Sequence, residues 1–166
     1  MSDQESNRLP AGIHNLKSEE TGCRHEASHT FRVQGHIDQV FGLFDPVSER
    51  DWVHDWDPQP IFPTELSREA GTVFTLHRDG RTAVWTVLRH DPAQHAAEYL
   101  VAESEYLHRW IRVSCSATDD ENTSVSVSYV TTALSDEGQQ DLQRYGKEFL
   151  LAWKGPVQDA INDLGA

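Results

Sequence analysis

The feature of this sequence that most constrains its fold is a change in the spacing of its apolar residues. Across most of residues 29–132, short runs alternate between apolar and polar side chains, and this period of two is typical of strands with one buried face. From residue 135 onward, apolar residues recur at intervals of three and four, as they do along an amphipathic helix. We therefore predict an α+β fold, in which a curved antiparallel sheet of about six to seven strands wraps around one long C-terminal helix.

Turn residues divide the alternating region into strands. The first predicted strand covers residues 29–34 and ends at a glycine. Later in the chain, Asp79-Gly80 is a strong signal for a tight hairpin turn, and further polar turns separate the other strands. Five consecutive antiparallel strands are predicted in this region, at residues 72–77, 82–89, 96–102, 106–116 and 123–132.

Two short helices are predicted after the first strand. Apolar side chains fall on one helical face of residues 37–44. Trp52 and Trp56 lie four residues apart, so a single helical turn places both indoles on one side. Prolines at positions 58, 60 and 63 then favour an extended connection to the next strand, because proline does not continue a helix.

The last predicted element is a long helix that begins after Ser135. A serine is a good N-cap, and Asp136 and Glu137 in the first turn meet the positive end of the helix dipole. Gly155-Pro156 is predicted to bend the helix in its second half, because proline removes one backbone hydrogen bond. The apolar stripe of this helix consists of Leu142, Tyr145, Phe149, Trp153, Val157, Ile161 and Leu164.

The apolar face of a single sheet must be covered, and only the C-terminal helix is long enough to cover it. Residues 123–132 show which face is buried, since Val125, Val127 and Tyr129 alternate with serines that point to water. A strongly twisted sheet wrapped around one helix leaves a space between them. We predict that this space is the binding site.

The order of these elements resembles the helix-grip fold of the START-related superfamily (SRPBCC), which includes polyketide cyclase-like and lipid-carrying proteins. The resemblance covers residues 28–164 and looks like that of many uncharacterised bacterial members. It is carried by four stretches: ERDWVHDWDP at 49–58, GTVF at 71–74, TAVWTV at 82–87 and SYVTTALSDEG at 128–138. These stretches are specific for the fold rather than for a reaction.

The resemblance implies a mostly apolar cavity between the sheet and the long helix, holding a small hydrophobic ligand that is lipid-like, aromatic or polyketide-like. It implies no particular reaction, because the superfamily has no shared catalytic triad to transfer. The START-like domain is expected to cover residues 25–166. Residues 1–24 are polar, lack a sustained period and are expected to form a flexible N-terminal tail.

Candidate ligand-binding residues are side chains expected to face this cavity. The rings of Trp85, Tyr99 and Tyr129 either contact a ligand, with the two hydroxyls orienting it, or belong to the core with their polar groups already hydrogen-bonded. Trp52 and Trp56 either form the cavity mouth or clamp the short helices onto the sheet. The predicted ligand-binding set is Trp52, Trp85, Tyr99, Arg109, Ile111, Tyr129, Phe149 and Trp153.

Arg109 is the most unusual member of this set, because it shares a strand face with Ile111 and other apolar residues. A buried arginine is costly unless it is paired. Arg109 therefore either binds a ligand carboxylate or enolate, or lies near the strand end and pairs with Glu103 or Glu105 at the rim. His77, beside a turn, is expected at an exposed strand end.

Charge and composition disfavour several classes of partner. With 14 Lys and Arg against 27 Asp and Glu, the net charge of −13 repels nucleic acid and anionic membrane surfaces. Apolar runs are far shorter than the ~20 residues of a membrane span. The N-terminal residues do not resemble a secretory signal, and Cys23 and Cys115 form no disulfide framework. We therefore expect a cytoplasmic protein without an integral membrane segment.

Metal and cofactor sites lack support in the sequence. The chain has nine histidines, but their spacing gathers no three or four ligands in one element. Motifs for a nucleophile elbow, a phosphate-binding loop and a zinc protease do not occur. We predict neither a metal nor a cofactor.

Three functions are compatible with these observations. The first is binding or carriage of a small hydrophobic molecule. The second is a cyclase- or dehydratase-type enzyme, in which Arg109, Tyr99, Tyr129 or a histidine polarises a carbonyl and transfers a proton. The third is a stress or co-chaperone-like module that binds proteins through its acidic surface. Edge strands would also permit a homodimer.

Overall fold

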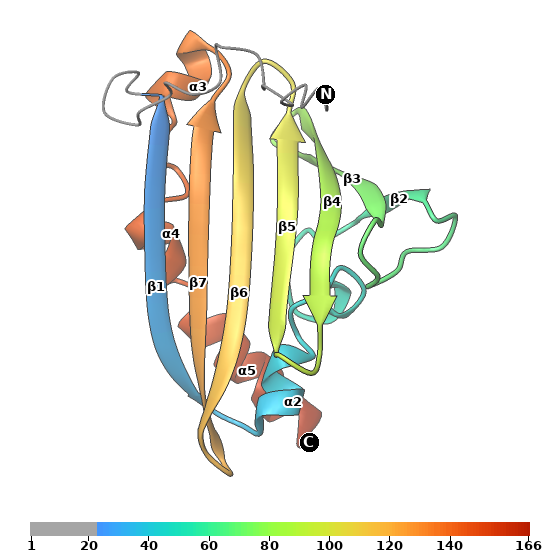
Figure 1. Cartoon of the computed structure of the whole chain (residues 1–166), viewed down its shortest axis with the longest axis vertical. Helices are drawn as coiled ribbons and strands as arrows, with labels where there is room; N and C mark the ends of the chain where they lie inside the picture. Colours follow the sequence, from blue (N-terminus) through green and yellow to red (C-terminus); the bar gives the residue numbers. More distant parts are fainter. Residues whose placement is uncertain (1–22) are drawn as a thin grey trace, which may run out of the picture.

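In the computed structural model, which describes residues 23–166, the chain forms one seven-stranded antiparallel sheet with helices against one face (Figure 1). The strands lie in the order β1-β7-β6-β5-β4-β3-β2. Their bounds are β1 (Arg24–Gln34), β2 (Gln59–Phe62), β3 (Val73–Arg78), β4 (Arg81–Asp91), β5 (Ala96–Glu103), β6 (Leu107–Asp119) and β7 (Asn122–Ala133). The predicted α+β helix-grip architecture is confirmed.

All five consecutive strands predicted from the alternation are present as β3 to β7. The tight turn at Asp79-Gly80 joins β3 to β4, and both residues adopt a positive φ, of 53° and 74°. Asp and Gly tolerate this left-handed conformation better than most residues, which is why the pair is a reliable hairpin signal. Hairpins also join β4 to β5, β5 to β6 and β6 to β7.

The two edges of the sheet differ from the prediction. Strand β1 begins at Arg24, five residues before the alternation becomes clear, and pairs with β7 over its whole length. The predicted tail at 1–24 otherwise lies outside the described residues. Strand β2 occupies the stretch expected to be only an extended connection, and its Pro60 is accommodated because β2 is an edge strand. The predicted homodimer, for which β1 and β2 are the available edges, stays a prediction.

Two short helices follow β1 as predicted, but the second lies earlier than expected, because residues 52–56 are not helical. Helix α2 (Ile37–Phe41) is shorter than expected and buries Val40 and Phe41. The second is a 3-10 helix, η1 (Ser48–Asp51). Asp45, between them, accepts hydrogen bonds from the backbone N–H groups of residues 47 and 48 and pairs with Arg68 at 2.9 Å, which fixes the start of η1.

The predicted long C-terminal helix is present over residues 147–164, but it begins later than expected and is interrupted at residues 152–153. Three helices occur: α3 (Asp136–Gln140), α4 (Lys147–Leu151) and α5 (Lys154–Leu164). Ser135 caps α3 as predicted, accepting a hydrogen bond from the Gly138 backbone N–H. The predicted bend at Pro156 is instead a break at residues 152–153. Because Pro156 has no N–H to donate to the residue 152 carbonyl, α5 starts afresh with the proline in its first turn.

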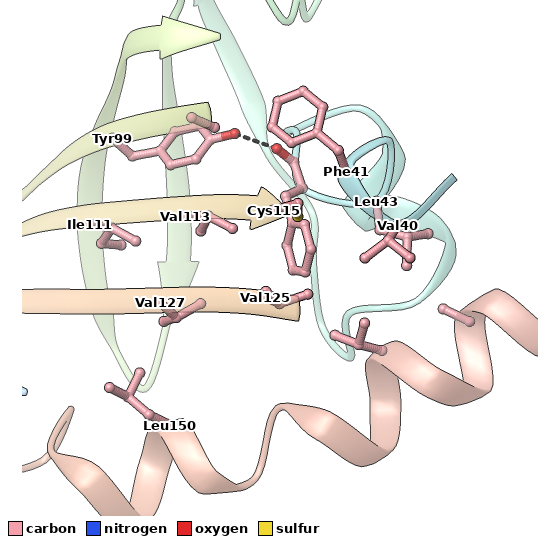
Figure 2. Close-up of a cluster of buried hydrophobic side chains, with 14 of the residues drawn as sticks. Val40, Phe41, Leu43, Tyr99, Ile111, Val113, Cys115, Val125, Val127 and Leu150 are labelled. Atoms are coloured by element: carbon pink, nitrogen blue, oxygen red, sulfur yellow. Dashed lines mark hydrogen bonds between the residues drawn. The ribbon is translucent and has the colours of Figure 1, made fainter. Parts of the chain in front are cut away.

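The core lies between the inward face of the sheet and the C-terminal helices (Figure 2). Val113 and Val127 face each other across β6 and β7, and both are almost fully buried. Leu150 of α4 and Val157 of α5 pack against this layer and have no exposed surface. The serines of β7 lie on the opposite, outward face, as the alternation predicts.

Replacing Leu150 with alanine should destabilise the fold by about 2–5 kcal/mol, because it removes a fully buried side chain and leaves a cavity in the core. Urea unfolding measures the effect. The neighbouring Leu151→Ala is the matched control, since Leu151 is 50% exposed and should change the free energy of unfolding by less than about 0.5 kcal/mol. Equal losses for both variants would contradict the placement of α4.

Candidate functional site

A cavity of about 330 Å³ lies between the sheet and the C-terminal segment. One wall comes from the inward faces of β3 to β7, a second from residues 49–56 around η1, and a third from residues 144–156 of the α4 region. The predicted space between sheet and C-terminal helix is thus present. It persists because α4 and α5 cover only part of the sheet, with α4 and α5 contacting β1 at the far edge.

All eight residues of the predicted ligand-binding set line this cavity. Their contact with a ligand stays a prediction. Two further aromatic residues, Trp56 and Tyr145, also line it. Each of the three cavity walls therefore carries at least two aromatic side chains, and the lining is mostly apolar.

The aromatic rings hold one another in fixed orientations. Trp85 stacks on Phe74 with ring centres 5.7 Å apart and meets Trp56 edge to face at 5.3 Å. Farther along the sheet wall, Tyr129 of β7 stacks on Tyr145 of the C-terminal wall at 5.9 Å. Such pairs contribute about 0.5–1.5 kcal/mol each beyond their buried area. These contacts hold the rings of the cavity walls against one another.

Trp52 and Trp56 combine the two alternatives considered for them. The Trp52 indole N–H donates to the Leu43 carbonyl at 2.9 Å, and that of Trp56 donates to the Pro46 carbonyl at 2.8 Å. These bonds clamp the segment after α2 in place. The remaining ring surface of both tryptophans faces the cavity.

Tyr99 and Tyr129 differ in the state of their hydroxyls. The Tyr99 hydroxyl donates to the Phe44 carbonyl at 2.7 Å, so it is already used within the protein (Figure 2). The Tyr129 hydroxyl has no hydrogen-bond partner among residues 23–166. Burial raises the pKa of Tyr129, so this hydroxyl keeps its proton and can donate it to a hydrogen bond.

Arg109 pairs with a glutamate, which is one of the two alternatives predicted for it. The pair lies inside the protein rather than at the rim of the sheet. The Arg109 Nη2 lies 2.6 Å from the Glu103 carboxylate, and both residues are more than nine-tenths buried. The guanidinium also lies 4.0 Å from the centre of the Tyr145 ring. Since the charge of Arg109 is neutralised by Glu103 and not by Glu105, Arg109 does not require an anionic ligand.

Glu49 is a cavity residue that the sequence reasoning missed. Its carboxyl has no hydrogen-bond or ion-pair partner in the described part of the chain. Removal from water raises the pKa of Glu49 well above its ordinary value; the neighbouring Asp45 raises it further, and Arg78 opposes the shift. Helical spacing from Trp52 and Trp56 does not identify Glu49, because η1 ends at Asp51 and residues 52–56 are not helical.

Ion pairs connect the two sides of the cavity mouth. Arg81 of β4 pairs with Glu137 of α3, and Arg144 pairs with Asp79 at 2.5 Å. Both acidic partners are more than half exposed, so each pair contributes little to stability. His77 is exposed as expected.

Within residues 23–166, no three His, Cys, Asp or Glu side chains gather in a way that would hold a metal ion. In the same stretch, no helix has the length and apolar character needed to cross a bilayer.

Comparisons with solved structures identify the fold. Norcoclaurine synthase from Thalictrum flavum, in complex with dopamine and hydroxybenzaldehyde, matches with a TM-score of 0.62 and 13% identity, over 86% of each chain. A START superfamily protein from Mycobacterium smegmatis matches with a TM-score of 0.64 and 12% identity, over 84% of this chain and 99% of that one. Ara h 8.0201 matches with a TM-score of 0.58 and 16% identity, over 85% of this chain and 97% of that one.

The helix-grip fold that the sequence resemblance implies is thereby confirmed. Identities of this size concern the fold alone. No protein-family model and no curated protein sequence matches the chain.

Glu103→Gln should destabilise the protein by about 3–5 kcal/mol, because it leaves the buried Arg109 guanidinium without a counter-charge. Urea unfolding at neutral pH measures this loss. Glu105→Gln, the same change at an exposed neighbour, is the control and should stay within about 0.5 kcal/mol of wild type. If the two variants lose the same stability, the buried pair is wrongly assigned.

Glu49 should make stability fall with rising pH. Its pKa is raised in the folded state, so its contribution is complete below the ordinary glutamate pKa of about 4.5 and is lost as pH rises through the folded-state pKa. The free energy of unfolding of wild type, relative to Glu49→Gln, should therefore decrease over that range. Glu148→Gln, at an exposed position of α4, should show no such divergence. Parallel pH profiles for wild type and Glu49→Gln would show that Glu49 is not desolvated.

Proposed function

We propose that this protein binds and carries a small, mostly apolar molecule that contains an aromatic or similarly flat ring system. The observation that carries the proposal is the cavity of about 330 Å³ with aromatic side chains on all its walls. Flat rings fit between such walls, since aromatic side chains stack on them and also meet them edge to face. A pocket of this volume, mostly apolar with a few polar groups, is typical of small-molecule sites.

The comparisons support the same proposal. The Thalictrum flavum synthase with this fold holds dopamine and hydroxybenzaldehyde, both small molecules with an aromatic ring. The low identity leaves the ligand of this chain to be argued from its own residues.

The alternative of a cyclase- or dehydratase-type enzyme has less support. An enzyme of this kind needs at least two of Arg109, Tyr99, Tyr129 and a histidine to converge at one point of the cavity. The Tyr99 hydroxyl and the Arg109 guanidinium are already engaged by Phe44 and Glu103. His54 is the one histidine of the cavity lining, and its side chain is 95% exposed at the mouth.

The co-chaperone alternative also has less support, because it predicts a shallow or filled cavity.

We further propose that the protein acts in the cytoplasm. The Cys115 thiol forms no disulfide, which fits a reducing compartment.

The proposal predicts that a bulky side chain at the cavity mouth weakens ligand binding. Ala152 lines the cavity but is exposed, so Ala152→Trp should fold normally while obstructing the opening. The affinity for a fluorescent apolar dye, measured through the quenching of tryptophan fluorescence, should weaken at least about tenfold, or about 1.4 kcal/mol.

Ala93→Trp is the matched control, because Ala93 is exposed in the β4–β5 turn, outside the cavity lining. It should bind the dye as wild type does. Native mass spectrometry gives an independent count of bound molecules. Absence of dye uptake by the wild-type protein, with no bound molecule detected, would overturn the proposal.

A further inference from the structure

The charges that line the cavity are reversed relative to the chain as a whole. In the sequence, acidic residues outnumber basic ones by 27 to 14. In the cavity lining, arginines at positions 78, 81, 109 and 144 outnumber the acidic residues Glu49, Asp79 and Glu103. The average composition of the chain does not account for this local excess of arginine, so the excess needs its own explanation.

Two of the four arginines are balanced within the lining. Arg109 is neutralised by the buried Glu103. Arg144 pairs with Asp79 at 2.5 Å and also donates to the Tyr106 hydroxyl at 3.3 Å. The excess therefore consists of the other two arginines, at positions 78 and 81, which lie at the two ends of the β3–β4 turn.

Arg78 and Arg81 lie directly opposite each other in the β3–β4 ladder, on the inward face of the sheet. Arg78 continues the face of the buried Leu76, and Arg81 continues that of the buried Ala83. The Cβ atoms of residues paired in this way are about 4.5–5.5 Å apart, and like charges in such a pair destabilise a sheet. The fold thus holds two positive charges together at one end of the cavity, at a cost in stability.

Both arginines keep N–H groups that the protein does not use. The Arg78 Nη2 donates to the backbone carbonyls of His54 at 3.0 Å and Asp55 at 3.4 Å, and Arg78 forms no ion pair in the described part of the chain. The Arg81 Nη2 pairs with Glu137, whose side chain is 62% exposed. At Nε and Nη1, neither guanidinium has an acceptor within residues 23–166, so these groups are available to a ligand.

Contacts with Tyr106 fix the Arg81 guanidinium before a ligand binds. The guanidinium lies 3.8 Å from the centre of the Tyr106 ring. Tyr106 is itself buried, and its hydroxyl donates to Asp141 at 2.6 Å. A planar guanidinium matches a carboxylate, to which it donates two parallel hydrogen bonds. Because Arg81 is already ordered, binding of a carboxylate there costs less conformational entropy.

We propose that the ligand of this cavity is an apolar acid, whose ring system lies between the aromatic walls and whose carboxylate binds Arg78 and Arg81 at the mouth. This inference rests on the proposed function and names its ligand class. A carboxylate between the two arginines relieves their mutual repulsion. At the mouth it also stays in contact with water, which limits the cost of removing its charge from solvent.

An organic cation is the competing ligand class, since a carboxylate such as Glu49 beside aromatic rings suits an ammonium group. The balance of charge opposes it. Once the ion pairs within the lining are set aside, Arg78 and Arg81 face Glu49 alone. Glu137, which pairs with Arg81 from α3, is mostly exposed, so water screens its charge. The remaining charge of the lining is positive, which favours an anion.

The test uses three naphthalenes of nearly the same shape, substituted at the same ring carbon: naphthylacetate, its neutral amide naphthylacetamide, and naphthylethylammonium. Titration calorimetry on the full-length protein at neutral pH measures each affinity. Naphthylacetate should bind at least about tenfold more tightly than naphthylacetamide, and naphthylethylammonium should bind most weakly. Raising the salt concentration from about 0.05 M to about 0.5 M should weaken naphthylacetate alone, because salt screens exposed charges.

Variants identify the two arginines. Arg78→Met and Arg81→Met keep an apolar side chain of similar length without the charge. Each should weaken naphthylacetate binding about 3- to 10-fold and change naphthylacetamide binding by less than about twofold. Arg81→Lys keeps the charge and should retain part of the affinity that Arg81→Met loses. Arg112→Met is the matched control, because Arg112 is exposed on the outward face of β6; it should bind as wild type does.

The outcomes separate this inference from the proposed function. Equal binding of naphthylacetate and naphthylacetamide would overturn the acid assignment and leave the proposed function standing, as would equal losses in Arg78→Met, Arg81→Met and Arg112→Met. Tightest binding of naphthylethylammonium, lost in Glu49→Gln, would replace the anion site with a cation site. Failure of all three naphthalenes to bind would overturn the acid assignment, and failure of the apolar dye as well would overturn both.

Discussion

The structure depends on a mismatch of area between the inward face of the sheet and the C-terminal segment that covers it. Seven strands present more apolar surface than helices α4 and α5 can cover. Near β1 the helices pack directly on the sheet, and Leu150 and Val157 are fully buried there. Toward β3 and β4 the covering is incomplete, and the uncovered surface becomes the wall of the cavity.

Aromatic side chains keep this uncovered space from collapsing. Their rings are too large to shift far, and each is held by a neighbour or by a backbone carbonyl, as Trp52 is by Leu43 and Tyr99 by Phe44. The buried pair of Arg109 and Glu103 adds a polar contact that packing alone would not supply. The same residues thus stabilise the fold and keep the cavity open.

Much of this arrangement could be predicted from the sequence, because strand alternation has a strict period. The alternation at Trp85, Tyr99 and Tyr129 determines which face each ring lies on, and that face lines the cavity. The long C-terminal helix was predicted correctly, but its start at residue 147 and its interruption at residues 152–153 were not. Its apolar period persists through the interruptions, and only Pro156 indicates one of them.

Glu49 and the partner of Arg109 required the structure. A glutamate in a polar stretch is ordinarily solvated, and the partial burial of Glu49 results from residues that the fold brings from distant strands. Local sequence offers both Glu103 and Glu105 as partners for Arg109, and only the backbone path between β5 and β6 selects the first. Local sequence patterns predict least well the side chains whose surroundings come from several strands and helices.

A crystal structure of the protein soaked with isopropylnaphthalene tests the central claim most directly, because this molecule needs only an apolar space. The account predicts its ring between Trp85, Tyr129 and Trp153, with little movement of these side chains. A cavity that has closed around its own side chains, or one filled by ordered water with the naphthalene absent, would contradict it.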